Sequence, residues 1–243
     1  MIEVTNLQKQ FKEIKAVDGL SFKVNQGEVF GLLGENGAGK TTTLRMLATM
    51  LQPTGGNALL NGQDLVKSPE KIRREIGILF GGETGLYDRL SARENIAYFG
   101  LLNGMEKNVL NQRIDQLSKQ LGMEDYIDRR AGKFSKGMKQ KVAIARSIIH
   151  DPQIMLFDEP TSGLDISAIR VVHDFIRELR AQGKTIIFSS HTMSEVEALC
   201  DRIAIMHKGK LVEIGTLSEI REKYQNENIE EIFMKLVGDD HEN

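Results

Sequence analysis

Apolar and polar residues recur with two different spacings along this chain. Short alternating or mainly apolar runs occupy positions 3–7, 20–24 and 58–62, with polar turns between them. Runs of this length, bounded by turn residues, predict the strands of a small sheet. Residues 42–51 instead repeat apolar side chains every three to four positions, which predicts a helix, and Pro53 marks the break after it.

The helical spacing dominates the middle of the chain. Apolar stripes there are bounded by a Ser-x-x-Glu capping box before the first stripe and a glycine after the second. The first predicted helix starts at the Ser91–Glu94 box and runs through Ile96 and Phe99. The second carries the stripe Leu110, Ile114, Leu117 and Leu121 and ends at Gly122, and the third spans about 136–149. From about residue 93 to residue 150 we therefore expect an all-helical lobe inserted into an α/β core.

Strand and helix patterns alternate after this lobe. The apolar runs 154–157 and 185–188 predict buried strands, and the segment between them has helical spacing over 172–179 with Gly183 behind it. Such alternation is typical of a parallel sheet covered by helices.

The end of the chain carries two further patterns. Runs 203–206 and 211–214, joined across a Lys-Gly pair, predict a closing hairpin. A last amphipathic helix is expected over 229–236, before the polar residues 239–243, which are expected to fray.

Composition places these elements in an ordinary globular protein of 243 residues. No apolar stretch approaches the roughly 20 residues that span a bilayer, and no secretory signal is visible at the start. The net charge of −2 argues against a protein built to coat nucleic acid or anionic lipid. The single Cys200 cannot form an internal disulfide, and we expect a small buried residue rather than a catalytic thiol.

The segment after the apolar run 28–33 reads G-x-x-x-x-G-K-T and opens the helix predicted over 42–51. Strand, glycine loop and helix in this order form a phosphate-binding loop. Glycines let main-chain N–H groups wrap the anion, because side chains there would obstruct those groups. Lys40 can reach the β and γ oxygens, and the Thr41 hydroxyl can ligate Mg²⁺. The predicted nucleotide-binding residues here are Gly34, Glu35, Asn36, Gly37, Ala38, Gly39, Lys40, Thr41 and Thr42.

Two adjacent carboxylates follow the apolar run 154–157. Placing the Asp158 and Glu159 carboxylates at the edge of a sheet costs desolvation free energy unless they bind a cation or a water there. We expect Asp158 to hold Mg²⁺, and Glu159 to orient or deprotonate the water that attacks a γ-phosphate. The alternative is an acidic turn that begins at Glu159 and Pro160, which the phosphate loop upstream disfavours.

With three further segments, the sequence resembles the nucleotide-binding subunits of ATP-binding cassette (ABC) transporters over almost its whole length. Residues 134–140, Phe-Ser-Lys-Gly-Met-Lys-Gln, are similar to the family's L-S-G-G-Q signature. Residues 162–165, Ser-Gly-Leu-Asp, are similar to the loop that crosses the dimer, and His191 to the switch histidine.

The resemblance implies an α/β fold of the P-loop NTPase (ABC ATPase) type. It implies a parallel-sheet core, an N-terminal antiparallel β subdomain and an inserted α-helical subdomain. Residues 1–243 would form a single domain, with the core and β subdomain in 1–92 and 151–220, the helical subdomain in 93–150, and a C-terminal helix and tail in 221–243.

The resemblance also implies two ATP molecules sandwiched between two subunits. Ser135 and Gly137 lie where a helix should begin, and would grip the γ-phosphate bound by the opposite subunit, with Asp165 beside it. His191, which alone would more often be an ordinary polar residue at a strand end, would act with the catalytic Glu159. Phe11 matches the aromatic on which adenine stacks, and the alternative is a plain core phenylalanine.

Two departures from the family pattern stand out. The family usually has Gln after the strand corresponding to 76–80, whereas here Glu83 is only a candidate substitute. The signature carries Lys136 and Met138 in place of Gly and Gln. The nearby lysines have three interpretations, of which a solvated helix face is preferred. An ATP-facing charge at Lys136 comes second, and a nucleic-acid patch comes a distant third. These lysines are Lys133, Lys136, Lys139 and Lys141.

The expected function is an ATP-binding and ATP-hydrolysing subunit that uses Mg²⁺ and drives export through a separate membrane-spanning permease. The resemblance also implies that the chain pairs with a second nucleotide-binding subunit as a homodimer and lies on the cytoplasmic face of the cell membrane. Nucleic acid is not an expected partner. Residues 80–90 with 134–138 most resemble the ATPase subunits of bacterial sodium exporters, which implies sodium extrusion.

Three alternatives remain. A soluble ABC ATPase would act on a partner such as an iron–sulfur assembly scaffold. A nucleic-acid-handling ATPase is disfavoured by the near-neutral charge and the lack of a long coiled-coil insertion. A P-loop kinase would leave the signature segment unexplained.

Overall fold

The computed structural model describes residues 1–80 and 85–238, which contain two β-sheets. The strands of the larger sheet are β3 (Val29–Leu33), β6 (Ile76–Phe80), β7 (Ile154–Asp158), β8 (Thr185–Ser190), β9 (Arg202–His207) and β10 (Lys210–Gly215). Their order is β10-β9-β3-β8-β7-β6, and all neighbours are parallel except β10, which is antiparallel to β9. The predicted parallel sheet and closing hairpin are confirmed.

Both faces of this sheet are covered, which explains the continuous apolar runs of its central strands. Because successive side chains of a strand point to opposite faces, the neighbours Ile187 and Phe188 belong to different core clusters. Ile187 packs in one cluster with helix α1 (Lys40–Leu47) and the smaller sheet. Phe188 packs in another with helix α6 (Ile166–Ala181) and the helical lobe.

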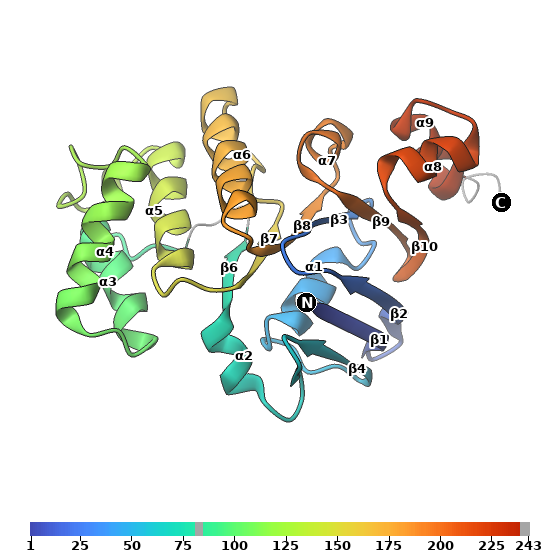
Figure 1. The fold of residues 1–243 in the computed structure, drawn as a ribbon, viewed down its shortest axis with the longest axis horizontal. Helices are drawn as coiled ribbons and strands as arrows, with labels where there is room; N and C mark the ends of the chain where they lie inside the picture. The colour runs from blue at the N-terminus through green and yellow to red at the C-terminus, as the bar shows by residue number, and fades with distance from the viewer. Residues whose placement is uncertain (81–84, 239–243) are drawn as a thin grey trace.

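The smaller sheet is antiparallel, with its strands in the order β2-β1-β4-β5. These strands are β1 (Ile2–Phe11), β2 (Ile14–Val24), β4 (Gly55–Leu60) and β5 (Gln63–Asp64). The predicted small sheet is therefore confirmed, with longer strands than the apolar runs indicated. Phe22 of this sheet stacks on Phe30 of the larger sheet, with ring centroids 5.3 Å apart. Helix α1 lies between the two sheets (Figure 1).

The helical lobe lies at one end of the molecule (Figure 1). Its helices are α3 (Ala92–Leu102), α4 (Lys107–Gln120), the 3₁₀ turn η1 (Ala131–Lys133) and α5 (Lys136–Ile148). The predicted capping box is present, with reciprocal hydrogen bonds between Ser91 and Glu94. Gly122 follows α4 with a left-handed φ of 59°, which is the conformation expected of a glycine that ends a helix.

Three short helices were not predicted: α2 (Pro69–Glu75), α7 (Met193–Leu199) and α8 (Leu217–Tyr224). Each has seven or eight residues, too few to show a clear apolar stripe. Helix α8 did carry a usable signal, because Thr216 and Glu219 form a capping box. The predicted last helix is confirmed as α9 (Ile229–Val237), which packs with α8 against β9.

Cys200 packs inside the fold. A Cβ at Gly31 would lie 2.8 Å from its sulfur, so strand β3 has no room for a larger residue there. Burial raises the pKa of the Cys200 thiol, which keeps it protonated and unreactive. This agrees with the expectation of a structural thiol.

Candidate functional site

The loop between β3 and α1 is tightly enclosed by other backbone segments. A Cβ on Gly34 would lie 2.6 Å from the carbonyl oxygen of Met206, and one on Gly39 would lie 2.5 Å from that of Ala16. Gly37 (φ 88°) and Gly39 (φ 102°) also adopt the left-handed conformation that favours glycine. The expectation that side chains here would block main-chain N–H groups stays a prediction, and the structure adds two further reasons for glycine. Neighbouring carbonyls exclude side chains at Gly34 and Gly39, and backbone conformation selects glycine at Gly37.

Lys40 is the first residue of α1 and is only 4% exposed. Its ammonium donates to the carbonyl oxygens of Gly34 (2.6 Å) and Glu35 (3.1 Å). The same nitrogen lies 3.5 Å from Glu159 Oε1. A buried ammonium requires such partners, so the positive charge is held at the loop and not in solvent.

Asp158 ends β7 and is also buried. Its Oδ1 accepts hydrogen bonds from Ser189 Oγ (2.6 Å) and Thr41 Oγ1 (3.1 Å). The pair Thr41 and Asp158 offers the hard oxygen ligands that Mg²⁺ prefers, and Mg²⁺ usually completes its shell with substrate phosphates and water. Within residues 1–80 and 85–238, no group of three or more His, Cys, Asp and Glu could hold a metal by itself. The donor set therefore fits a Mg²⁺ ion shared with a phosphate ligand.

Glu159 has a left-handed backbone conformation (φ 47°), which is uncommon for a residue other than glycine. Its N–H donates to the carbonyl oxygen (3.2 Å) and hydroxyl (3.0 Å) of Ser189. The carboxylate lies between two basic groups, since Oε1 is 3.2 Å from His191 Nδ1 as well as near Lys40. A turn does begin here, because the Ser162 N–H donates to the Glu159 carbonyl oxygen. The acidic turn and the converging site therefore coexist.

His191 follows β8, and its side chain is half-exposed. Its Nδ1 lies 3.2 Å from Glu159 Oε1, within ion-pair distance of that carboxylate. Strands β7 and β8 are parallel neighbours, which brings His191 to the end of the sheet that carries Asp158 and Glu159. Its role at the γ-phosphate stays a prediction.

Phe11 ends β1 and is 45% exposed, so the alternative of a plain core phenylalanine is wrong. Its β-hairpin partner Ile14 is also exposed. Strand β2 continues from Ile14 to Ala16, whose carbonyl oxygen packs against Gly39 of the phosphate loop. The exposed ring therefore lies on the hairpin that flanks this loop.

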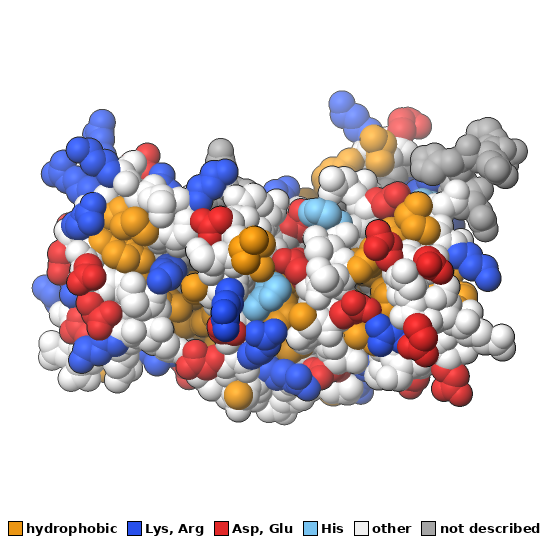
Figure 2. All heavy atoms as spheres, turned by 90° about the horizontal axis from the view of Figure 1, so that it is seen from above, with side chains coloured by type: hydrophobic (Ala, Val, Ile, Leu, Met, Phe, Trp, Pro, Cys, Tyr) orange, Lys and Arg blue, Asp and Glu red, His pale blue; other side chains and the backbone are white. Residues whose placement is uncertain are grey.

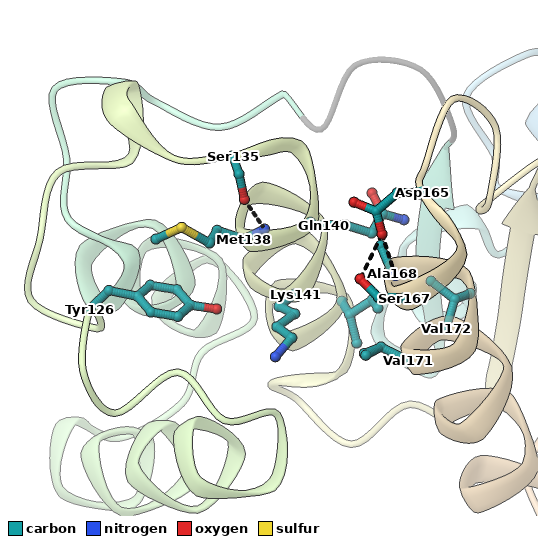
Figure 3. A pocket seen from close by; sticks show the side chains of 12 residues that line it. Tyr126, Ser135, Met138, Gln140, Lys141, Asp165, Ser167, Ala168, Val171 and Val172 are labelled. Carbon is teal, nitrogen blue, oxygen red and sulfur yellow. Dashed lines mark hydrogen bonds between the residues drawn. The ribbon is translucent and has the colours of Figure 1, made fainter.

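Ser135 and Asp165 are both helix N-caps. Ser135 Oγ accepts the N–H of Met138 at the start of α5 (3.2 Å). Asp165 Oδ1 accepts from Ser167 Oγ (2.6 Å) and from the Ala168 N–H (2.9 Å) at the start of α6. These hydrogen bonds, the one from Ser167 first, lower the pKa of the Asp165 carboxyl. Figure 3 shows the two caps on facing helices.

A pocket of about 290 Å³ lies between these two helices (Figure 3). Gly137 lines it, and a Cβ there would meet the Ala168 side chain at 3.5 Å. The pocket is bordered by Tyr126, Ser135, Gly137, Met138, Gln140, Lys141, Ile144, Asp165, Ser167, Ala168, Val171 and Val172. The structure thus brings Ser135, Gly137 and Asp165 together at one pocket, and these three residues are called the signature surface below. The Lys40 corner is the separate group formed by Lys40, Thr41, Asp158, Glu159 and His191.

The lysines near the signature segment have different surroundings. Lys133 and Lys136 are exposed, whereas Lys139 lies 3.2 Å from Asp88. Basic and acidic side chains both lie at the helical end of the face shown in Figure 2. The exposure of Lys133 and Lys136 agrees with a solvated helix face, the first interpretation of these lysines. Glu83, the candidate substitute for the family's Gln, lies outside the described residues.

Two buried polar residues of the site were not predicted. Ser189 holds both Asp158 and the Glu159 backbone, and the polar pair after the apolar run 185–188 was a usable signal for it. Gln140 donates from Nε2 to the Pro160 carbonyl oxygen (2.8 Å), joining α5 to the turn after Glu159. No local pattern indicates this contact, because it depends on how α5 packs against the core.

Comparison with known proteins places this geometry in a family. Residues 17–162 match the family model described as ABC transporter. The chain belongs to the ABC transporter family. It is 51% identical over 242 residues to the ABC transporter ATP-binding protein NatA of Bacillus subtilis (strain 168), with 98% of each chain covered.

Two solved structures resemble this ABC ATPase. One is described as the ATP binding subunit of an ABC transporter, with a TM-score of 0.88, 30% identity, and 97% and 99% of the two chains covered. The other is a dimeric post-hydrolysis state of the ATP-binding cassette MJ0796 bound to ADP and Pi. It has a TM-score of 0.80, 25% identity, and 89% and 98% coverage.

These relationships establish the ABC ATPase as an ATP-binding subunit, and its domain implies ATP hydrolysis. The dimeric cassette supports a second nucleotide-binding subunit as a partner. Across the described ranges, 1–80 and 85–238, none of the helices has the length and apolar character needed to cross a membrane.

Proposed function

We propose that this ABC ATPase binds ATP with Mg²⁺ at the Lys40 corner and hydrolyses it to power export through a separate membrane-spanning subunit. The observation that carries the proposal is the convergence on one carboxylate. Glu159 Oε1 lies 3.5 Å from Lys40 Nζ and 3.2 Å from His191 Nδ1, at the end of the strand that delivers Asp158.

Nucleotide binding would use the loop from Gly34 to Thr42. Its main-chain N–H groups and the positive end of α1 would bind the phosphates. Lys40 would exchange its two carbonyl contacts for the β and γ oxygens. The exposed ring of Phe11 would stack on the adenine. Because Lys40 is already buried and oriented, little ordering would be needed when the phosphates bind.

Thr41 and Asp158 would hold Mg²⁺, Thr41 through its hydroxyl and Asp158 through the water shell of the ion. When bound, the ion would neutralise charge that develops on the transferred phosphoryl group. Ser189 would keep the Asp158 carboxylate oriented through its 2.6 Å hydrogen bond.

Hydrolysis would use Glu159 and His191 together. Glu159 would orient the attacking water and accept its proton, and the contact with Nδ1 would keep the His191 ring beside the γ-phosphate. The left-handed backbone at Glu159, held by two hydrogen bonds to Ser189, would fix the direction of the carboxylate.

A second copy of the chain would complete the site. Ser135, Gly137 and Asp165 lie on the signature surface, where the side chains of Ser135 and Asp165 accept N–H groups of their own helices. Against a second copy, they would contact the γ-phosphate bound by that copy, which is supported by the dimeric cassette of similar fold. ATP would then close the dimer and hydrolysis would open it.

The proposed function also includes a membrane partner and a transported solute. We propose attachment to the cytoplasmic face of the cell membrane through a permease, supported by the family and by the 51% identity to NatA. Sodium ions are the proposed cargo, on the sequence resemblance of residues 80–90 and 134–138. A soluble ABC ATPase acting on an iron–sulfur scaffold is not favoured, because the relatives are ATP-binding proteins of transporters.

Purification of the tagged chain from detergent-solubilised membranes tests the partner class. Recovery with a multi-spanning membrane protein is expected, and consistent recovery with soluble scaffolds alone would overturn the motor proposal. The recovered complex, placed in vesicles, should move ²²Na⁺ when Mg²⁺ and ATP are added, whereas a complex carrying Glu159→Gln should not. ATP-driven movement of another solute without sodium would contradict sodium as the cargo but would leave the proposal of ATP-powered export standing.

A further inference from the structure

A second cluster of buried polar side chains lies behind the turn that carries His191. Ser190, the last residue of β8, is 2% exposed, and Glu195, in the first turn of α7, is 7% exposed. Burying a carboxylate is costly unless polar partners or a helix N-terminus compensate for the lost water. The partners of Glu195 therefore indicate what the buried charge does.

One hydroxyl joins Glu195 to both sides of His191. Ser190 Oγ donates to Glu195 Oε2 at 2.7 Å and accepts the Thr192 N–H at 2.9 Å. Ser190 and Thr192 are the residues immediately before and after His191. The backbone on either side of the histidine is therefore held by a hydroxyl that Glu195 orients.

The other carboxylate oxygen of Glu195 faces helix α6. His173 Nε2 lies 3.5 Å from Glu195 Oε1, within ion-pair distance but without hydrogen-bond geometry. Among the described residues this buried nitrogen has no hydrogen-bond partner. Helix α6 begins at the Asp165 cap, so Glu195 lies between the helix of the signature surface and the turn of His191.

A pocket of about 350 Å³ connects these groups with the proposed catalytic residues. Glu159 and His191 line it together with His173 and Glu195. The loop 161–164 forms another part of the wall. A change in the Glu195 cluster can therefore reach the Glu159–His191 contact by a short path of bonded and packed groups.

We propose that Glu195 is a positioning residue for ATP hydrolysis. Through Ser190 it holds the turn that keeps His191 Nδ1 against Glu159, while its other carboxylate oxygen lies 3.5 Å from His173 Nε2 of α6. The inference rests on the proposed function, since it assumes that His191 contributes to the reaction.

The test compares Glu195→Ala and Ser190→Ala with the unmodified full-length chain. Both variants should lower kcat by about 10- to 100-fold, because small misplacements of an orienting group are costly, while the Kd for ATP stays within about twofold. The histidine NMR signal of His191, assigned with His191→Gln, should shift in both variants. Glu195→Gln keeps an oxygen that accepts from Ser190, so it should recover most of the activity.

Glu197→Ala is the matched control, because Glu197 is on the same helix but pairs with Arg221 at the surface. It should change neither kcat nor the His191 signal. If the His191 signal is unchanged in folded Ser190→Ala and Glu195→Ala protein, the positioning role is overturned. If the signal shifts while kcat does not, the positioning role stands, and the catalytic part assigned to His191 in the proposed function is wrong.

Discussion

The Lys40 corner and the signature surface differ in how their polar groups are satisfied. In the corner, groups from α1, β7 and the end of β8 bind one another, as in the contacts of Glu159 with Lys40 and His191. On the signature surface, Ser135 and Asp165 each bond to N–H groups of their own helix. The contacts of the corner are therefore made within one chain, whereas the proposed role of the signature surface requires a second copy.

This difference separates two properties that a single assay would combine. Binding of ATP should depend on the corner alone, because Lys40 and the glycine loop need no second subunit. ATP-driven closure should depend on Ser135 and its neighbours as well. Substitutions in the two regions are therefore expected to have separable effects.

Glu159→Gln should have the largest effect on turnover. Removing the proton acceptor should lower kcat by roughly 10²–10⁴-fold, while ATP binding remains and an ATP-bound dimer accumulates. Steady-state ATPase assays and size-exclusion chromatography with ATP measure the two outcomes. Glu178→Gln, on the exposed side of α6, is the control. Unchanged turnover would remove Glu159 from its assigned role.

Lys40→Ala should act on binding itself. Loss of a buried, oriented ammonium should raise the Kd for ATP by about 10²-fold, which corresponds to about 3 kcal/mol. Calorimetric titration with Mg²⁺ and ATP measures the change, and Lys71→Ala on the exposed face of α2 is the control. A wild-type Kd would contradict the phosphate-loop assignment.

Ser135→Phe should spare binding to the single chain and weaken the dimer. A bulky ring forced into a packed contact costs about 1–3 kcal/mol, so the dimer should dissociate about 10- to 100-fold more readily. Sedimentation with the Glu159→Gln background, which prevents turnover, provides the measurement. Ser68→Phe alters the N-cap of α2, far from both regions, and should leave the dimer intact. A normal dimer in Ser135→Phe would count against the proposed sandwich.

Gln140→Leu should act on stability alone and tests the link between the two regions. It leaves the Pro160 carbonyl oxygen without its buried partner, which should lower the free energy of unfolding by about 1–3 kcal/mol. Urea denaturation measures this loss, with Gln116→Leu on the exposed side of α4 as the control. Stability equal to that of the control would mean that this hydrogen bond does not join α5 to the core.

Most of the regular structure could be predicted because its signals are local. The strand run 154–157, the capping box at Ser91 and the apolar stripe of α4 each report an element whose buried face is set by nearby residues. Helices α2 and α7 could not be predicted in this way. With seven residues each, they owe their stability to packing against neighbours that are distant in the chain.

By itself, the sequence determined which residues carry the phosphate loop, the paired acids and the signature, since short-range spacing places each motif at a strand end or a helix start. Only the tertiary structure decided what these groups touch. It turned Phe11 outward, put Glu159 between Lys40 and His191, and placed Ser189 beneath Asp158. The physical reason is that parallel strands bring distant segments to one edge of a sheet, and the register that aligns them depends on the packing of the whole core.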